Sequence, residues 1–332
     1  MRKITRSFLA AILISLLFSA VACSRDKEPD AAQDTEKIQK KIVLGFSQVG
    51  AESNWRTANS ESIKTAARDE GIELLFLSAQ QKPENQIKDV RSLIAQQVDV
   101  IAFSPIVEYG WGTVLKEAKL AGIPVIIMDR GIDEQDKSLY VTHIGSDFAE
   151  QGRKAGRWLL EKVGDSNERV NVVEIQGTFG STPTNGRREG FIEIIKQNPN
   201  IFVTNSKAGD FMRSKGKEVM EEFLNDKGSE IDVVYAHNDD MALGAIEAIE
   251  EYGLRPGKDI KIISIDAVKA AFDAMKAGKL NCTVECNPLQ GPELMKAVKD
   301  LMAGKQLPKR IVINEGIFRE ETAEADFINR NY

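Results

Sequence analysis

From Lys41 onward, short apolar runs alternate with longer stretches in which apolar positions recur every three or four residues. Short continuous apolar runs suit strands buried on both faces, whereas the longer stretches suit amphipathic helices. The alternation therefore predicts β-strand–helix–β-strand units and a parallel sheet. The first series has predicted strands at 42–46, 72–78, 100–104, 124–129 and 140–145, and predicted helices at 55–71 and 83–97.

The same alternation then restarts without obvious sequence repetition. Helices are predicted at 148–163, 185–198, 213–227, 241–252 and 268–278, and strands at 169–176, 202–208, 233–236 and 260–265. A second parallel sheet accounts for this series. The pattern predicts an α/β protein with two doubly wound, Rossmann-like lobes, and the length of the chain suits two domains of ordinary size.

The N-terminal segment has the pattern of an export signal. Arg2, Lys3 and Arg6 precede an apolar run at 8–21, which is 14 residues long and is followed by Cys23. A membrane-spanning helix needs roughly 20 apolar residues, so a cleaved signal peptide at 1–22 is the better interpretation. The sequence at 20–23 resembles a bacterial lipobox, which predicts lipid attachment at Cys23 and a location on the outer face of a membrane. An ordinary signal peptide cut after Ala22 is the alternative.

Residues 23–40 are polar and charged without apolar periodicity, which predicts a flexible tether. Without residues 1–22, 41 basic residues oppose 50 acidic ones and the net charge is −9. Such a charge disfavours nucleic-acid binding. Cys282 and Cys286 lie four residues apart, roughly 13 Å on one strand, too far for a disulfide unless the chain turns between them. With no histidine nearby they are poor metal ligands, and we expect no metal and no cofactor.

Ligands of open parallel sheets bind beyond the carboxyl ends of the strands. The residues that follow predicted strands are 47–56, Pro105, Asp129, Arg130, His143, 178–187, Asp210, Phe211, 238–240 and Asp266. Hydrogen-bonding side chains dominate this set, with a few aromatic rings.

A sugar presents hydroxyl groups that donate and accept hydrogen bonds, and an apolar face of C–H groups. Trp55 and Phe211 are suited to pack against a sugar ring. The carboxylates of Asp129 and Asp266 accept from hydroxyls, whereas Arg130 and Asn238 donate. The set therefore favours a carbohydrate over an amino acid or a phosphate.

Structural roles are the alternative for several of these residues. Asp129 is also suited to cap the turn after its strand, and 238–240 is a good helix N-cap region. We expect Glu108, Tyr109 and Trp111 to open a helix and pack at the surface. His143 alone is more often structural.

Enzyme motifs are missing from the expected places. The chain has no GxGxxG turn after its first predicted strand, no GxxxxGK[ST], no GxSxG and no HExxH. His143 and His237 belong to different lobes. We therefore expect no enzyme, although the spacing of two acidic residues, which a glycoside hydrolase requires, cannot be read from sequence.

From Lys41 to about Ile317 the chain resembles the type I periplasmic sugar-binding proteins, which include ribose-, galactose- and galactofuranose-binding members. The general family motifs are Ile123-Pro124-Val125 before Asp129-Arg130, the run 237–244, and Ser264-Ile265-Asp266. Further stretches look closer to the galactofuranose-binding members, namely 45–50, Glu52-Ser53, Trp55-Arg56, 80–82, 84–88, 136–140, 209–211 and 213–221. The resemblance implies a hexose, in furanose form or as galactose. Asn185, where ribose binders have arginine, and Cys286, in place of their hinge-side glutamine, argue against ribose.

The resemblance also implies which residues touch the sugar. The first lobe is expected to contribute Ser47, Glu52, Trp55, Arg56, Asp129 and Arg130, and we place His143 with them. The second lobe is expected to contribute Arg187, Phe211, Asn238 and Asp266.

The family fold implies three crossings between the lobes. The first lobe then comprises 41–146 and 287–314, and the second 147–286 and 315–332. The implied partners are an ABC permease with its ATPase subunits, and we expect a monomer. A transcriptional repressor shares this fold, but it begins with a helix-turn-helix rather than a signal peptide. A sensory partner of a membrane receptor remains open.

Overall fold

The computed structural model describes residues 41–164, 167–328 and 332. Cys23 and the predicted signal peptide and tether lie outside the described residues. The first lobe consists of β1 (Val43–Gln48), α1 (Asn54–Asp69), β2 (Glu73–Ser78), α2 (Pro83–Ala95), β3 (Val100–Phe103), α3 (Gly112–Leu120), β4 (Val125–Met128), the 3₁₀ helix η1 (Lys137–Leu139), β5 (Thr142–Ser146), α9 (Gly291–Met302) and β11 (Arg310–Ile313).

The second lobe is built in the same way. It consists of α4 (Phe148–Val163), β6 (Val170–Gln176), α5 (Thr182–Ile195), β7 (Ile201–Ala208), α6 (Arg213–Lys227), η2 (Gly228–Glu230), β8 (Val233–Ala236), α7 (Asp239–Glu251), β9 (Lys261–Asp266), α8 (Lys269–Lys276), β10 (Cys282–Glu285), β12 (Ile317–Arg319), η3 (Glu320–Thr322) and α10 (Ala323–Phe327).

Each lobe contains one six-stranded sheet. The strand order is β11-β5-β4-β3-β1-β2 in the first lobe and β12-β10-β9-β8-β6-β7 in the second. The first sheet is parallel throughout. In the second, β12 pairs antiparallel with β10 and the other strands pair in parallel. The predicted α/β class with two doubly wound lobes is confirmed, with β12 as an antiparallel edge strand that the sequence pattern did not show.

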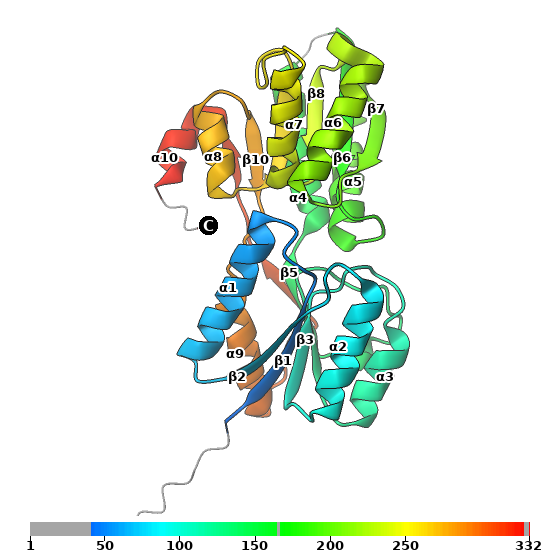
Figure 1. Cartoon of the computed structure of the whole chain (residues 1–332), viewed down its shortest axis with the longest axis vertical. Coiled ribbons are helices and arrows are strands. Elements are labelled where there is room, and N and C mark those ends of the chain that lie inside the picture. Colours follow the sequence, from blue (N-terminus) through cyan, green and yellow to red (C-terminus); the bar gives the residue numbers. More distant parts are fainter. Residues whose placement is uncertain (1–40, 165–166, 329–331) are drawn as a thin grey trace, which may run out of the picture. The chain divides into compact units, whose positions relative to one another are not determined.

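Both faces of the first sheet are covered by helices (Figure 1). Leu44 and Phe46 pack with residues of α1 and α9 on one face. Ile101 and Phe103 pack with residues of α2 and α3 on the other. All four side chains are fully buried, and each contributes about 1.5–3 kcal/mol by leaving water. Burial on both faces explains why the strands are continuous apolar runs.

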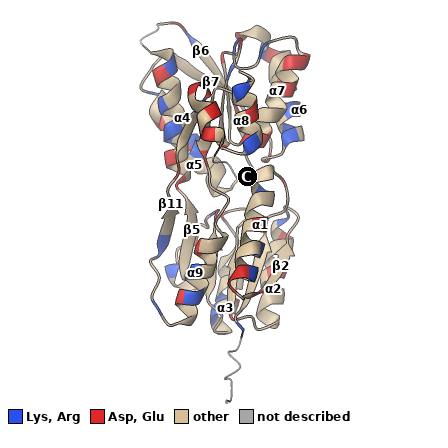
Figure 2. Ribbon diagram, turned by 90° about the vertical axis from the view of Figure 1, so that its left-hand side faces the viewer, with Lys and Arg blue, Asp and Glu red and all other residues tan. Residues whose placement is uncertain are grey.

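The charged side chains lie largely on the helices, whereas the strands carry few of them (Figure 2). Trp111, expected at the surface, is instead only 2% exposed. Its ring packs against Phe103 at a centroid distance of 4.7 Å, and its Nε1 donates to the Val107 oxygen. That expectation was wrong because a buried aromatic contact competes with surface placement at the start of α3. Within the described residues, no helix is both long enough and apolar enough to cross a membrane.

Three short segments connect the lobes, and we call them the hinge. They are residues 146–147 at the end of β5, 286–290 after β10, and 314–316 between β11 and β12. Because β11 belongs to the first sheet and β12 to the second, neither lobe is continuous in sequence.

Candidate ligand-binding site

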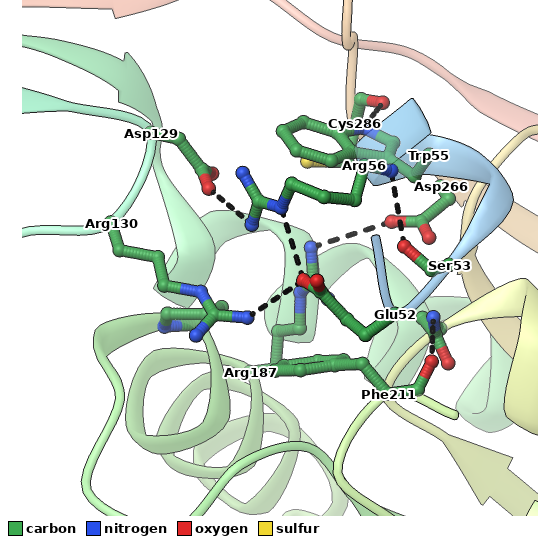
Figure 3. Close-up of a pocket in the computed structure, with 12 residues that line it drawn as sticks. Glu52, Ser53, Trp55, Arg56, Asp129, Arg130, Arg187, Phe211, Asp266 and Cys286 are labelled. Atoms are coloured by element: carbon green, nitrogen blue, oxygen red, sulfur yellow. Dashed lines mark hydrogen bonds and ion pairs between the residues drawn. The ribbon is translucent and has the colours of Figure 1, made fainter. Parts of the chain in front are cut away.

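A cavity of about 290 Å³ lies where the loops at the carboxyl ends of both sheets meet. The cavity is lined by Glu52, Ser53, Trp55, Arg56, Asp129, Arg130, Pro183, Arg187, Phe211, Asn238, Asp266 and Cys286 (Figure 3).

Helix α1 delivers two of these side chains. It begins after Ser53, whose hydroxyl accepts a hydrogen bond from the Arg56 backbone N–H at 3.1 Å. This N-cap directs Trp55 and Arg56 of the first turn into the cavity. The indole Nε1 of Trp55 donates to the Cys286 oxygen at 2.6 Å, and the Arg56 guanidinium lies 4.7 Å from the indole ring centre. Trp55 therefore fixes both the hinge backbone and a charged wall of the cavity.

Four charged side chains of the first lobe form one buried network. Arg56 Nη2 lies 2.8 Å from Asp129 Oδ2, and Arg56 Nε lies 3.0 Å from Glu52 Oε1. Arg130 Nη2 lies 3.5 Å from the same Glu52 oxygen. Ser104 Oγ also donates to Asp129 Oδ2 at 3.0 Å. The network places two guanidinium groups and two carboxylates along the cavity wall (Figure 3).

The electrostatics of this network keep Arg56, Asp129 and Arg130 charged at neutral pH. Burial alone raises the pKa of Asp129, but the guanidinium groups of Arg56 and Arg130 outweigh it and hold this pKa below its ordinary value. Burial and repulsion by Arg56 lower the pKa of Arg130 to about 10. The pKa of Arg56 is raised because attraction to Asp129 and Glu52 overcomes the effect of burial.

Two buried atoms of the network have no hydrogen-bond partner among the described residues. They are Glu52 Oε2, which accepts, and Arg130 Nε, which donates. An unpaired buried polar atom costs about 1–3 kcal/mol. Because both residues line the cavity, a ligand whose hydroxyl groups donate and accept supplies what these atoms lack.

The second lobe contributes an opposed pair of charges. Arg187 of α5 lies with Nη2 3.7 Å from Asp266 Oδ1, and both side chains are buried. Burial raises the pKa of Asp266 well above its ordinary value, and only the Arg187 guanidinium opposes that shift among the stronger influences. The Arg187 Nη1 donates to the His237 oxygen. Asp266 therefore presents to the cavity a carboxyl group whose ionised form is disfavoured by burial and favoured by Arg187.

Asn238 and Phe211 complete the second wall. Asn238 is the N-cap of α7, with its Oδ1 accepting from the Met241 N–H at 3.0 Å and its Nδ2 donating to the Phe211 oxygen at 3.2 Å. The ring of Phe211 lies near both Arg130 and Arg187, at 5.1 and 5.8 Å from their guanidinium carbons. The capping role that the sequence suggested for Asn238 and its place in the cavity are thus compatible.

Three site residues have a backbone in the left-handed region. The φ angles are 54° for Asp129, 65° for Phe211 and 130° for Asp266. Non-glycine residues adopt such angles at a cost of about 1–3 kcal/mol, and they concentrate at functional sites. The three strained positions lie at the end of β9 or just after β4 and β7, where the chain turns into the cavity.

Nine of the eleven residues predicted from sequence line this cavity: Glu52, Trp55, Arg56, Asp129, Arg130, Arg187, Phe211, Asn238 and Asp266. Ser47 and His143 do not. Ser47 is fully buried and donates to Asp89 Oδ2 at 2.7 Å, because alternation along β1 turns it toward α2. His143 supports the site from behind, with Nε2 2.9 Å from the Asp129 oxygen.

Sequence reasoning missed Ser53, Pro183 and Cys286 as lining residues. Ser53 and Pro183 lay within the ranges that follow predicted strands but were not singled out, and Cys286 was noted only as a departure from the pattern of ribose binders. Burial raises the pKa of the Cys286 thiol well above its ordinary value, so the thiol is a weakly polar wall atom. No group of three or more potential metal ligands occurs in the described part of the chain.

A two-lobed α/β fold with its polar cavity at the carboxyl ends of both sheets defines a periplasmic binding protein of type I. The chain belongs to the periplasmic binding protein domain family, whose model matches residues 44–306. The galactofuranose-binding protein YtfQ of Escherichia coli K12 is 44% identical over 299 residues, 89% of this chain and 93% of that protein. The resemblance stated from the sequence motifs is confirmed.

Solved structures agree with this assignment. A Mycobacterium smegmatis protein in complex with β-D-fucofuranose has a TM-score of 0.86 and 51% identity, covering 88% of this chain and 95% of that one. The binding component of the arabinose ABC transporter from Shewanella sp. ANA-3, bound to α- and β-L-arabinofuranose, has a TM-score of 0.84 and 48% identity, covering 87% and 96%.

Proposed function

We propose that this protein captures a monosaccharide, a hexose such as galactose or its furanose form, and delivers it to the permease of an ABC-type importer. The observation that carries the proposal is the pair of unpaired buried atoms, Glu52 Oε2 and Arg130 Nε, in the polar cavity between the two lobes. The relatives named for galactofuranose, fucofuranose and arabinofuranose support the furanose form.

The donors and acceptors of the cavity match a sugar better than an anion. Glu52, Asp129 and Asp266 provide carboxyl oxygens, and Arg56, Arg130 and Arg187 provide guanidinium donors. The positive charges are already matched by carboxylates in the two networks, so an anionic ligand gains no free cation. The ring of Phe211 supplies the apolar surface on which C–H groups of a sugar pack.

Binding without chemistry suits this site. The carboxyl groups of Asp129 and Asp266 are each already paired with an arginine, Asp129 with Arg56 and Asp266 with Arg187. The two carboxyl groups also belong to opposite lobes. In this proposal the ligand closes the lobes around itself, and the polar groups exclude water from it. The protein is then a carrier rather than an enzyme.

The bonds that join the lobes around the cavity support this mechanism. Asn54 N–H donates to Asp240 Oδ2 at 2.9 Å, Gly131 N–H donates to Thr182 Oγ1 at 2.8 Å, and Asn185 Nδ2 donates to Glu108 Oε1 at 2.8 Å. Each pair joins one residue of each lobe and is therefore formed only when the lobes are closed. Asn185 thus contributes to closure from the rim.

Export and anchoring belong to the same proposal. In this proposal residues 1–22 are a signal peptide removed on export, and a lipid on Cys23 holds the mature protein outside the cytoplasmic membrane. This arrangement keeps the folded part close to its permease.

Thermal unfolding of the mature protein, freed of co-purified ligand by unfolding and refolding, tests the ligand. The panel is D-galactose, D-fucose, L-arabinose, D-ribose and D-fructose, all of which include furanose forms in solution. Sugar at 100 times its Kd stabilises the folded state by about 2.7 kcal/mol, which is a shift of several degrees. We expect the largest shift with D-galactose or D-fucose. A shift with D-ribose alone contradicts the hexose assignment, and no shift with any sugar contradicts sugar binding.

A further inference from the structure

One carboxylate holds all three hinge segments together. Glu315 lies in the third segment, and its Oε1 accepts hydrogen bonds from Ser146 Oγ in the first segment at 2.6 Å and from the Asn287 N–H in the second at 2.8 Å. Its other oxygen, Oε2, accepts from Gln151 Nε2 at 2.6 Å. Glu315 is thus the point at which the hinge meets α4 of the second lobe.

Gln151 passes this contact on to the cavity. Its side chain is only 1% exposed, and its Oε1 accepts from Arg187 Nε at 2.9 Å. Arg187 in turn lines the cavity and faces Asp266. The chain Glu315–Gln151–Arg187 therefore runs without interruption from the hinge to the ligand wall.

Two glycines make this chain possible. A Cβ atom at Gly152 would overlap the Arg187 oxygen, and a Cβ atom at Gly190 would overlap the Ala149 oxygen. Both glycines let the backbones of α4 and α5 come into direct contact. Because the two helices lie this close, the side chain of Gln151 in α4 reaches the side chain of Arg187 in α5 directly.

The two outer residues of the series Glu315–Gln151–Arg187 determine which atom of the Gln151 amide donates and which accepts. The Nε–H of Arg187 only donates, so the amide atom that faces it is the oxygen of Gln151. The amide nitrogen of Gln151 then points to Glu315, and an ionised carboxylate only accepts. Gln151 Nε2 also approaches the Glu285 oxygen at 3.3 Å, which favours the same orientation.

We propose that Gln151 and Glu315 are positioning residues that form a polarised relay: they orient the Arg187 guanidinium toward the ligand and tie it to the hinge, so that ligand contact and lobe closure are coupled. The link to a sugar rests on the proposed function, whereas the relay itself does not. A ligand that contacts Arg187 and shifts its guanidinium group therefore acts, through Gln151, on Glu315, the residue that joins the three hinge segments.

The substitution Glu315→Gln tests whether the relay needs an acceptor at residue 315, because it keeps a side chain of the same size in the hinge. The Asn287 N–H only donates, so the amide oxygen of the new side chain stays at the Oε1 position and keeps the bonds from Asn287 and Ser146. Its NH₂ group then faces the NH₂ group of Gln151, and rotating the Gln151 amide sets a second donor against Arg187. Either arrangement leaves buried donors unpaired.

A second substitution restores the acceptor. In the double variant Glu315→Gln, Gln151→Glu, the carboxylate at 151 accepts from both Arg187 and the amide at 315. The weak hydrogen bond to the Glu285 oxygen is lost, and two acceptor oxygens then face each other at that contact. Ser146→Ala is the matched control, since it removes one hydrogen bond from the same carboxylate but leaves the polarity toward Gln151 unchanged.

The relay is measured first without sugar, by the Nε–H NMR resonance of Arg187 in ¹⁵N-labelled protein, assigned by its loss in Arg187→Lys. We expect at least tenfold faster exchange of this proton with water in Glu315→Gln, and wild-type behaviour in Ser146→Ala and in the double variant. Equal exchange in Glu315→Gln and wild type overturns the proposal.

Sugar affinity is measured next by calorimetry with the panel sugar that stabilises the wild type most. Glu315→Gln should bind about tenfold or more weakly, Ser146→Ala within about twofold of wild type, and the double variant should recover most of the loss. A double variant as weak as Glu315→Gln overturns the relay. If Glu315→Gln does not fold, Gln151→Met, which neither donates nor accepts, should show the same loss. If no sugar binds the wild type, the proposed function fails while the NMR result still decides the relay.

Discussion

Asn54 donates two hydrogen bonds to the carboxylate of Asp240 in the opposite lobe. Its backbone N–H lies 2.9 Å from Oδ2 and its Nδ2 lies 3.1 Å from Oδ1. Asn54 is the first residue of α1 and Asp240 lies in the first turn of α7. The bonds therefore connect the N-termini of two helices of opposite lobes, and the lobes cannot part there without breaking them.

Substitution Asn54→Ala should speed ligand release. It removes the side-chain bond to Asp240 and leaves the backbone bond, which costs the closed state about 1 kcal/mol, or about fivefold in affinity. Stopped-flow fluorescence should show this loss mainly as faster dissociation. Asn205→Ala is the control, because Asn205 Nδ2 also donates to a carboxylate, that of Asp226, but within the second lobe. Equal dissociation rates in Asn54→Ala and wild type exclude a role in closure.

Substitution Asp129→Asn should weaken sugar binding tenfold to a hundredfold, in line with the loss of a charged hydrogen-bond acceptor. It also leaves Arg56 and Arg130 with one carboxylate fewer. Asparagine tolerates the left-handed backbone at this position better than alanine does, so the change isolates the charge. Calorimetry measures the affinity.

The paired substitutions Ser47→Ala and Asp89→Asn provide the control for Asp129. They alter a polar contact in the same lobe that lies outside the cavity. Affinity should stay within about twofold of wild type. A large loss in Ser47→Ala would return Ser47 to the ligand site, as the sequence resemblance implied.

The pKa of His143 gives a test by pH. Burial, with Arg310 nearby, lowers this pKa from 6.5 to about 4 in the folded protein. Between these values the unfolded chain binds the additional proton, so the free energy of unfolding falls as pH decreases from 6.5 to 4. His143 alone accounts for on the order of 1–3 kcal/mol.

Urea unfolding at pH 7, 6, 5 and 4.5 measures this dependence. His143→Gln, whose amide still donates to the Asp129 oxygen, should flatten the pH dependence by the contribution of His143. An unchanged slope in the variant would mean that the pKa of His143 is not lowered in the folded protein.

Lipid attachment is tested by Cys23→Ser. The variant should move from the membrane fraction to the soluble exported fraction, since a lipid on the cysteine sulfur is the proposed anchor. Ser24→Ala, which keeps the cysteine, should remain with membranes. A membrane-bound Cys23→Ser would show that the retained signal segment or another contact holds the protein.

The sequence predicted most of the fold because strands buried on both faces leave long apolar runs, as Leu44 and Ile101 do in the first sheet. It also located most of the cavity, since polar residues directly after such strands meet at one edge. Ser47 was wrongly predicted to face the cavity, because side chains alternate between the two faces of β1 and Ser47 points toward α2. The pairing of Gln151 with Glu315 has no trace in the sequence, because 164 residues separate them and neither breaks a local pattern.

The position of β11 in the sequence determines when the first sheet can be completed during synthesis. Its edge strand β11 is made only after the whole of β6 to β10 has been synthesised, so the first lobe cannot finish its sheet until residues 310–313 are available. A chain that leaves the ribosome from its N-terminus therefore carries an incomplete first lobe through almost its entire synthesis. The complete first sheet, with β11 at its edge, can therefore form only near the end of synthesis.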